Sequence, residues 1–321
     1  MHCYSFSGPK VTDELAPSLL IKALTDASRH GYGVASFSGG EPLMYKGLPD
    51  LLAHAHACGM LTTITTNGML LDERRLEQLH GKVDLIAISL DGRPESHNRV
   101  RASPRAFSGM RSRLKHLRKS GIPFGFIFTL TQYNLDELDW VAAFAVKEGA
   151  QLLQIHPLEN VGRAAEEMAG ERPDQTEAAY AVIEALRLKD YIGERVHIQV
   201  DLIDRQYVEN EPETFFAGEL PGDSDNSPFA ELISPLVIEP DGAVVPIQYG
   251  FARKFALGSL YEASLDELIK TWRGVKMLEF RALCRRLVDS QTGPAELPFF
   301  NWYELLGEMA DNRASAAGTT N

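Results

Sequence analysis

The stretch Ser38-Gly39-Gly40-Glu41-Pro42 is the most informative part of the sequence, and it emerges from a short apolar segment, GVASFS at 33–38. An apolar run of this length, bounded by glycine, is typical of a buried strand. The two glycines let a ligand approach the backbone closely, the glutamate offers an anionic hydrogen-bond acceptor, and the proline stiffens the turn. Taken alone, the stretch also fits an ordinary turn between a strand and a helix.

Two further strand patterns end in similar polar turns. LTTITT at 61–66 leads into Asn67-Gly68, and VDLIAISL at 83–90 leads into Asp91-Gly92. Asn-Gly and Asp-Gly are strong turn formers, so each pair alone is weak evidence for a site. Their recurrence is stronger evidence, because the carboxyl ends of parallel strands meet at one edge of a sheet.

Strand and helix patterns alternate over the first 190 residues. Further strands are predicted at 124–131 and 152–157, and helices are predicted to start near 13, 72, 104, 134 and 173. The helix that starts at Asn134 has Glu137 three residues on, the spacing of a capping box. Alternation with apolar strands predicts a parallel sheet covered by helices, either doubly wound or a β/α barrel.

The pattern changes after about residue 191. A strand is predicted at 196–201, an acidic loop at 209–226, a hairpin at 235–247 and a capped helix at 264–272. The small, polar tail at 313–321 is expected to be disordered.

Composition excludes several classes of protein. The 321 residues carry 32 Lys and Arg against 44 Asp and Glu, a net charge of −12 spread along the chain, which argues against a nucleic-acid partner. No apolar run of membrane-spanning length is present, and the first residues lack a signal-peptide pattern. Three cysteines exclude a disulfide-stapled scaffold and favour a cytoplasmic location without membrane partners.

In this order the motifs resemble the radical S-adenosylmethionine (radical SAM) superfamily. The resemblance covers roughly 1–165 and continues through HNRVR at 97–101 and through Pro157-Leu158, with Gly162-Arg163-Ala164 beyond. It implies an α/β fold, a partial (β/α)6 TIM-type barrel. It also implies a 4Fe–4S cluster that binds and cleaves S-adenosylmethionine (SAM), and the resulting radical abstracts hydrogen from a substrate. An electron donor such as flavodoxin or ferredoxin is implied as a partner.

The resemblance assigns cofactor contacts residue by residue. Gly39, Gly40 and Glu41, followed by Pro42, would hold the amino group of the SAM methionine. The ribose would meet Ser89 and Asp91, Asn67 would be a second polar contact, and Gly162-Arg163 would lie near the adenine or the SAM carboxylate.

The cluster loop departs from the family pattern. Cys3 matches the third cysteine of a C-x3-C-x2-C loop and is the expected metal ligand, but the other two cysteines and the first barrel strand are not in the sequence. One cysteine does not hold a 4Fe–4S cluster. The alternatives are a start-site truncation, which is favoured because an unpaired strand edge would otherwise be exposed, and a degenerate member of the family.

The last third resembles the SPASM or twitch extension, which binds auxiliary clusters. The segment 238–246 matches its hairpin, but Ile247 stands where the extension has a cysteine, and Cys284 is followed by Leu287 where it has a second one. A degenerate SPASM/twitch-like α+β extension is therefore expected, with an unrelated α+β cap as the alternative. The predicted domains are a barrel at 1–190, the extension at 191–312 and a tail at 313–321.

Two other patterns favour plain structural interpretations. His54, His56 and Cys58 lie on a predicted helix, where only the first and last share a face, so a metal site is not expected. The basic run at 111–119 is typical of a solvated helix face.

Three functions remain open at this level. The first is a radical SAM enzyme that acts on a peptide, a haem precursor or another small cofactor precursor. The second is a non-catalytic relative that binds a peptide or another partner. The third is an α/β enzyme that uses Glu41 and Asp91 as acid and base. Substrate, product and oligomeric state do not follow from the sequence.

Overall fold

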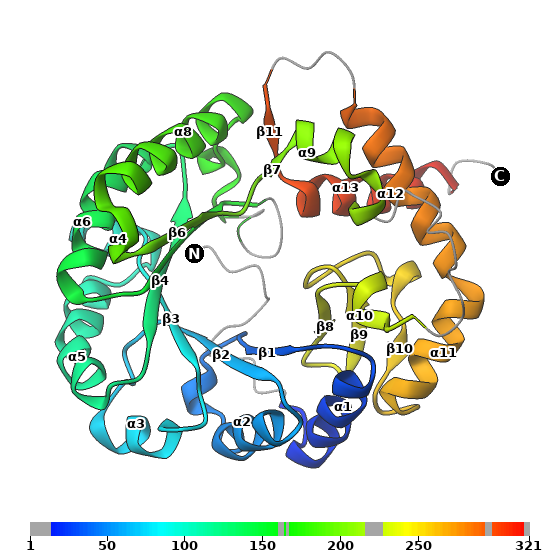
Figure 1. The fold of residues 1–321 in the computed structure, drawn as a ribbon, viewed down its shortest axis with the longest axis horizontal. Helices are drawn as coiled ribbons and strands as arrows, with labels where there is room; N and C mark the ends of the chain where they lie inside the picture. Colours follow the sequence, from blue (N-terminus) through cyan, green and yellow to red (C-terminus); the bar gives the residue numbers. More distant parts are fainter. Residues whose placement is uncertain (1–13, 160–163, 165–166, 216–226, 293–296, 318–321) are drawn as a thin grey trace. The chain divides into compact units, whose positions relative to one another are not determined.

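The computed structural model describes 14–159, 164, 167–215, 227–292 and 297–317 (Figure 1). Cys3, Gly162 and Arg163 lie outside these residues. The chain divides into two compact units: the first comprises 1–10 and 33–201, and the second comprises 11–32 and 202–321. The predicted boundary at 190 therefore differs from the observed one, since the strand at 197–200 belongs to the first unit and the helix that precedes 33 to the second.

The first unit is built on six parallel strands in sequence order. They are β1 (Val34–Phe37), β2 (Leu61–Thr66), β3 (Leu85–Ser89), β4 (Phe124–Leu130), β5 (Leu152–Pro157) and β6 (His197–Val200). Helices between the strands cover one face of this sheet (Figure 1): α2 (Leu48–Ala57), α3 (Glu73–Leu79), α4 (Pro94–Val100), α5 (Ala106–Ser120), α6 (Leu138–Glu148) and α8 (Gln175–Ile192). This is the predicted partial TIM-type barrel.

Alternation along the strands separates two faces of the sheet. On β5, Leu153 and Ile155 are fully buried against the helices, whereas Gln154 and His156 are partly exposed on the opposite face. We call that opposite side the inner face. Its polar members are Ser36, Thr63, Thr65, Ser89, Thr129, Gln154, His156, His197 and Gln199, and apolar residues such as Leu61, Ile127 and Leu152 share the face.

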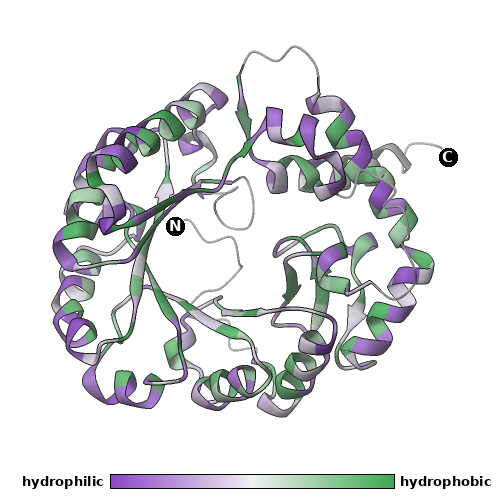
Figure 2. Cartoon of the chain, in the orientation of Figure 1, coloured by the Kyte–Doolittle hydropathy of each residue, from purple (hydrophilic) through white to green (hydrophobic). Residues whose placement is uncertain are grey.

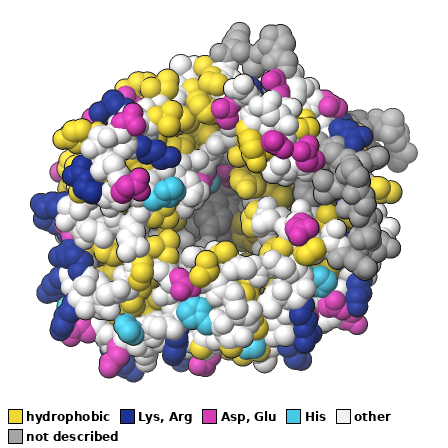
Figure 3. Space-filling model, in the orientation of Figure 1, with side chains coloured by type: hydrophobic (Ala, Val, Ile, Leu, Met, Phe, Trp, Pro, Cys, Tyr) yellow, Lys and Arg dark blue, Asp and Glu magenta, His cyan; other side chains and the backbone are white. Residues whose placement is uncertain are grey.

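In the ribbon coloured by hydropathy, the hydrophobic positions of these helices are on the side toward the sheet and the hydrophilic positions are on the outside (Figure 2). The basic run on α5 lies at the outer rim, where Lys and Arg side chains are prominent (Figure 3). Lys119 bonds Glu73 there at 3.1 Å. The run is therefore a solvated helix face.

Most predicted helix ends agree with the structure, but the capping box at Asn134 does not. A short 3-10 turn at Leu135–Glu137 precedes α6, and Asn134 makes no capping bond to it. Instead its side chain accepts from the Thr131 N–H and donates to the carbonyls of Asp91 and Thr129. Asn134 thus ties the ends of β3 and β4 together.

The second unit packs helices around two small antiparallel sheets. The predicted hairpin is present as β8 (Leu236–Ile238) and β9 (Ala243–Pro246), joined by β10 (Gly258–Ser259). The strands β7 (Ile203–Asp204) and β11 (Phe299–Phe300) form a second pair. The helices are α1 (Pro17–Arg29), α9 (Arg205–Asn210), α10 (Phe229–Leu232), α11 (Leu265–Val275), α12 (Met277–Gln291) and α13 (Trp302–Ala317). The helix α13 continues to Ala317, and the disordered tail expected at 313–321 stays a prediction; residues 318–321 lie outside the description.

Candidate functional site

The turns after β1 and β2 are locked together by one carboxylate. Glu41 Oε1 accepts from the Thr66 hydroxyl at 2.7 Å and from the Leu43 N–H at 3.1 Å, and Oε2 accepts from the Asn67 N–H at 3.0 Å. Burial raises the pKa of Glu41, although these hydrogen bonds and the nearby Arg101 oppose the shift. Desolvation therefore outweighs the contacts that the protein itself supplies, and a bound cation would favour the ionised carboxylate.

The double glycine leaves room beside this carboxylate. Gly39 and Gly40 have φ of +82° and +52°, in the left-handed region that glycine adopts without strain. No described atom lies within 4 Å of the Cβ that a side chain would add at either position. A ligand can therefore reach the backbone of both residues.

Two polar side chains lie at the end of β3, the hydroxyl of Ser89 and the carboxylate of Asp91. Ser89 lies on the inner face, and its hydroxyl makes no hydrogen bond with the described residues. Asp91 is fully buried, and its oxygens accept from Arg101 Nε at 2.6 Å and Nη2 at 3.2 Å. The Asp91 N–H donates to Nδ1 of the buried His97 at 3.1 Å. In this structure Asp91 thus holds Arg101, rather than presenting a carboxylate to a ligand.

The structure brings some of the residues predicted from the sequence together. Gly39, Gly40, Glu41 and Asn67 belong to one connected turn pair, and Pro42 is buried as the first residue of the turn Pro42–Met44. The Asn67 side chain closes its own turn by accepting from the Met69 N–H at 2.9 Å. Arg101 and His97 received no role from the sequence, although the motif HNRVR contains both.

A second polar cluster lies on the inner face at the ends of β5 and β6. Asp201 accepts from Gln154 at 2.6 Å, Gln199 at 2.9 Å and His156 Nδ1 at 3.0 Å. Sequence reasoning missed this cluster, because His156 and Asp201 are 45 residues apart and only strand alternation could have placed them on one face.

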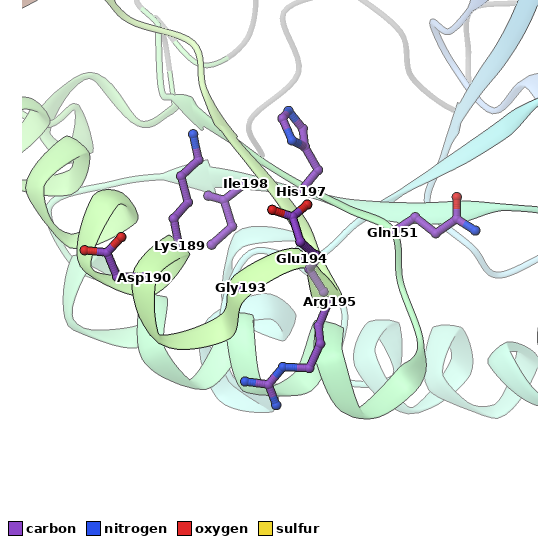
Figure 4. A pocket seen from close by; sticks show the side chains of 9 residues that line it. Gln151, Lys189, Asp190, Gly193, Glu194, Arg195, His197 and Ile198 are labelled. Atoms are coloured by element: carbon purple, nitrogen blue, oxygen red, sulfur yellow. The ribbon is translucent and has the colours of Figure 1, made fainter.

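A hollow at the other edge of the sheet is separate from these groups (Figure 4). It is lined by the end of α8 and the start of β6, including Lys189, Arg195 and His197. The guanidinium of Arg195 donates hydrogen bonds to the carbonyls of Tyr191 and Ile192. Because its lining residues precede β5 and begin β6, the hollow lies at the amino ends of the strands, away from the polar turns.

The described residues fit SAM better than they fit an iron–sulfur cluster. An open double-glycine turn, a desolvated carboxylate and an available serine hydroxyl suit an amino acid joined to a nucleoside. Cys58 is half-buried with its sulfur 3.6 Å from His54 Nε2, and Cys284 is buried in the second unit. Within the described part of the chain, no three His, Cys, Asp or Glu side chains are grouped to hold a metal.

The fold is a partial β/α barrel, and polar turns follow the carboxyl ends of its first strands. Residues 1–145 match the family model of the radical SAM superfamily. No helix among the described residues is long and apolar enough to cross a membrane.

Three relatives of similar sequence are named for different reactions. The Fe-coproporphyrin III synthase of Methanosarcina barkeri is 30% identical over 165 residues, 51% of this chain and 41% of that protein. The PqqA peptide cyclase of Xanthomonas campestris is 24% identical over 197 residues, 61% of this chain and 52% of that protein. The sporulation killing factor maturation protein SkfB of Bacillus subtilis is 25% identical over 299 residues. The match covers 92% of this chain and 68% of that protein. The chain thus spans about half the length of the first two.

Solved structures share the fold across both units. The structure of anSMEcpe with bound AdoMet and a peptide has a TM-score of 0.63 at 18% sequence identity. The match covers all of this chain and 95% of anSMEcpe. SuiB of Streptococcus suis, solved with its precursor peptide SuiA, has a TM-score of 0.62 at 14% identity, covering 83% of this chain and 60% of SuiB. At these identities the likeness establishes the fold.

Proposed function

We propose that this protein is a radical SAM enzyme that modifies a peptide. The observation that carries the proposal is the pair of turns in which Glu41 joins the ends of β1 and β2 beside the open backbone of Gly39 and Gly40. A buried carboxylate with a raised pKa is stabilised by an ammonium group, and SAM carries one. The structural neighbours anSMEcpe and SuiB were solved with bound S-adenosylmethionine.

This chain's residues would bind and orient SAM. Gly39 and Gly40 would give the methionine end access to the backbone, Glu41 would accept from the amino group, and Ser89 would offer its hydroxyl to the ribose. Asp91 would act indirectly by holding Arg101. When SAM is bound to a reduced 4Fe–4S cluster, the chemistry supplied is a 5′-deoxyadenosyl radical that abstracts hydrogen.

Cys3 is the residue of this chain that would bind the cluster. The resemblance assigns it this role, and the described residues add no ligand set.

A peptide substrate is favoured by the extent of similarity. The match to the SkfB maturation protein covers 92% of the chain and so includes the second unit. The match to the coproporphyrin synthase stops at 51%. A haem precursor is the second candidate, because this partial match has the higher identity, at 30%.

The activity is tested by anaerobic SAM cleavage with the protein as its host produces it. We expect reductant-dependent formation of 5′-deoxyadenosine, lowered at least about tenfold in Glu41→Gln, since a lost charge-assisted bond contributes about 1.5–3 kcal/mol. Glu177→Gln, at the cap of α8, is the matched control. SAM binding without cleavage would favour the non-catalytic alternative, and cleavage that needs no iron would contradict the proposal. Peptides and porphyrins from cells with and without the gene, compared by mass spectrometry, would identify the substrate class.

A further inference from the structure

The inner face carries a histidine–carboxylate pair that the SAM site does not use. His156 Nδ1 is 3.0 Å from Asp201 Oδ2, and Asp201 is held from both sides by Gln154 and Gln199. The backbone supports the same arrangement, since the Asp201 N–H donates to the Ile155 carbonyl at 2.9 Å and extends the ladder between β5 and β6. Asp201 is therefore fixed by three neighbours besides the histidine.

This geometry orients the imidazole. A carboxylate on Nδ1 holds the proton there in the neutral ring, so that Nε2 is the acceptor, and it stabilises the ring after Nε2 has been protonated. The His156 side chain is 36% exposed, whereas that of Asp201 is 14% exposed. The histidine thus reaches the inner face, and the carboxylate stays behind it.

Two carboxylates of the described residues lie near the ring, and both favour its protonation. Asp201 lies at the end of β6, and Glu159, in the segment after β5, has Oε1 3.8 Å from Nε2. The neighbour on β4 is Thr129, which is paired with His156 in the parallel register and carries no charge. Two carboxylates within 4 Å raise the basicity of an imidazole.

His156 lies at the same edge of the sheet as the SAM site. Ser89 pairs with Ile127 on β4, and Thr129, two residues further along, pairs with His156 on β5. Two strand spacings separate Ser89 from His156, a lateral distance of about 10 Å. A substrate next to the nucleoside of SAM would therefore meet the histidine.

The geometry points to His156 as the proton-accepting residue for the substrate, with Asp201 as its positioning residue; this inference rests on the proposed function. The substrate group is an N–H, O–H or S–H of a peptide. Its proton moves to Nε2, the substrate heteroatom keeps the electron pair, and the imidazolium is stabilised by Asp201. The proton leaves to water after product release.

Side-chain NMR of the full chain with ¹³C-labelled histidine tests the pair without catalysis. His156→Gln assigns the signal, and His197→Gln is the matched control, since His197 lies on β6 at the opposite edge of the sheet. We expect the pKa of His156 to fall by about one unit or more in Asp201→Asn. An unchanged pKa would overturn the inference.

Titration with SAM separates this inference from the proposed function. We expect SAM to shift the ¹H–¹⁵N signal of Gly40 and the ring signals of His156, and to leave His197 unchanged. A shift of Gly40 without one of His156 would overturn the inference alone, and no shift of Gly40 would count against the proposed function. With a peptide substrate, Asp201→Asn should lower kcat/KM at least about tenfold at neutral pH and move its acidic limb to lower pH, because a base with a lower pKa loses its proton sooner.

Discussion

The two units of the chain differ in where their polar side chains lie. The first unit packs apolar side chains against helices on one face of its sheet, and its inner face carries serine, threonine, glutamine and histidine side chains beside some apolar ones. The second unit has a continuous apolar core that includes Trp272, Phe251, Phe255, Phe280 and Cys284. Polar groups that a ligand could use are therefore concentrated in the first unit, and the second unit contributes packing.

The position of Ile247 sharpens this contrast. The resemblance to the SPASM extension puts a cluster ligand there, but Ile247 is buried in the apolar core of the second unit. It adopts φ of +72°, a conformation that strains a β-branched side chain. Apolar packing in this unit thus occupies the place where the SPASM extension has a cluster ligand.

The largest expected effect is on the stability of the apolar core. Trp272 is 2% exposed, and its indole N–H donates to the Phe255 carbonyl at 2.8 Å. Trp272→Ala should lower the free energy of unfolding by about 3–5 kcal/mol. Thr63→Ala on the inner face removes only a bond to Ser36 Oγ and should cost about 0.5–1.5 kcal/mol. Urea denaturation measures both, and equal losses would refute the contrast between the units.

Cysteine reactivity gives the next largest contrast. Burial strongly raises the pKa of the Cys284 thiol, so it carries little thiolate at neutral pH. Iodoacetamide should label Cys58 at least about tenfold faster than Cys284 in the native protein, because only the thiolate reacts. Mass spectrometry of tryptic peptides measures the rates, with urea-unfolded protein as the control. Rapid native labelling of Cys284 would show that the core of the second unit opens.

The pH dependence of stability tests the desolvated carboxylate of the first unit. Burial raises the pKa of Glu41, so the folded state binds its proton more tightly than the unfolded chain. Stability therefore falls as the pH rises from about 4, near the ordinary value, through the raised pKa. The free energy of unfolding of the wild type, relative to Glu41→Gln, should decrease over this range. A relative stability that increases with pH would mean that the hydrogen bonds outweigh burial.

The smallest expected effects should be equal in the two units. Both carry a capping box, with Asp174 and Glu177 on α8 and with Ser264 and Glu267 on α11. Asp174→Ala and Ser264→Ala should each lower stability by about 0.5–2 kcal/mol. Thermal unfolding measures the pair. A far larger loss for one of them would show that its unit governs the unfolding transition.

Local patterns in the sequence predicted most of the fold. The strands at 61–66 and 152–157 and the hairpin at 235–247 are confirmed, because alternation and turn chemistry are local signals. The double-glycine turn was predictable for the same reason. Asn134 was misread because its side chain bonds to two strand ends rather than to its own helix.

Long-range pairs could not be predicted in the same way. The ion pair of Asp91 with Arg101 and the contact of His156 with Asp201 depend on which residues the strands bring together. The unit boundary also depends on tertiary packing, since α1 packs against α11 although they are about 240 residues apart. Local sequence patterns do not indicate which distant residues come into contact.

Two left-handed glycines give the most direct test of a SAM site at the strand ends. Gly40 and Gly59 have φ of +52° and +80°, and no described atom lies within 4 Å of an added Cβ at either. Alanine should strain both backbones by about 1–2 kcal/mol, but only at position 40 should it obstruct the ligand. Calorimetric titration with SAM should give one site per chain in the wild type and in Gly59→Ala, with affinity at least about tenfold weaker in Gly40→Ala. Equal affinity in all three proteins would contradict a SAM site at this turn.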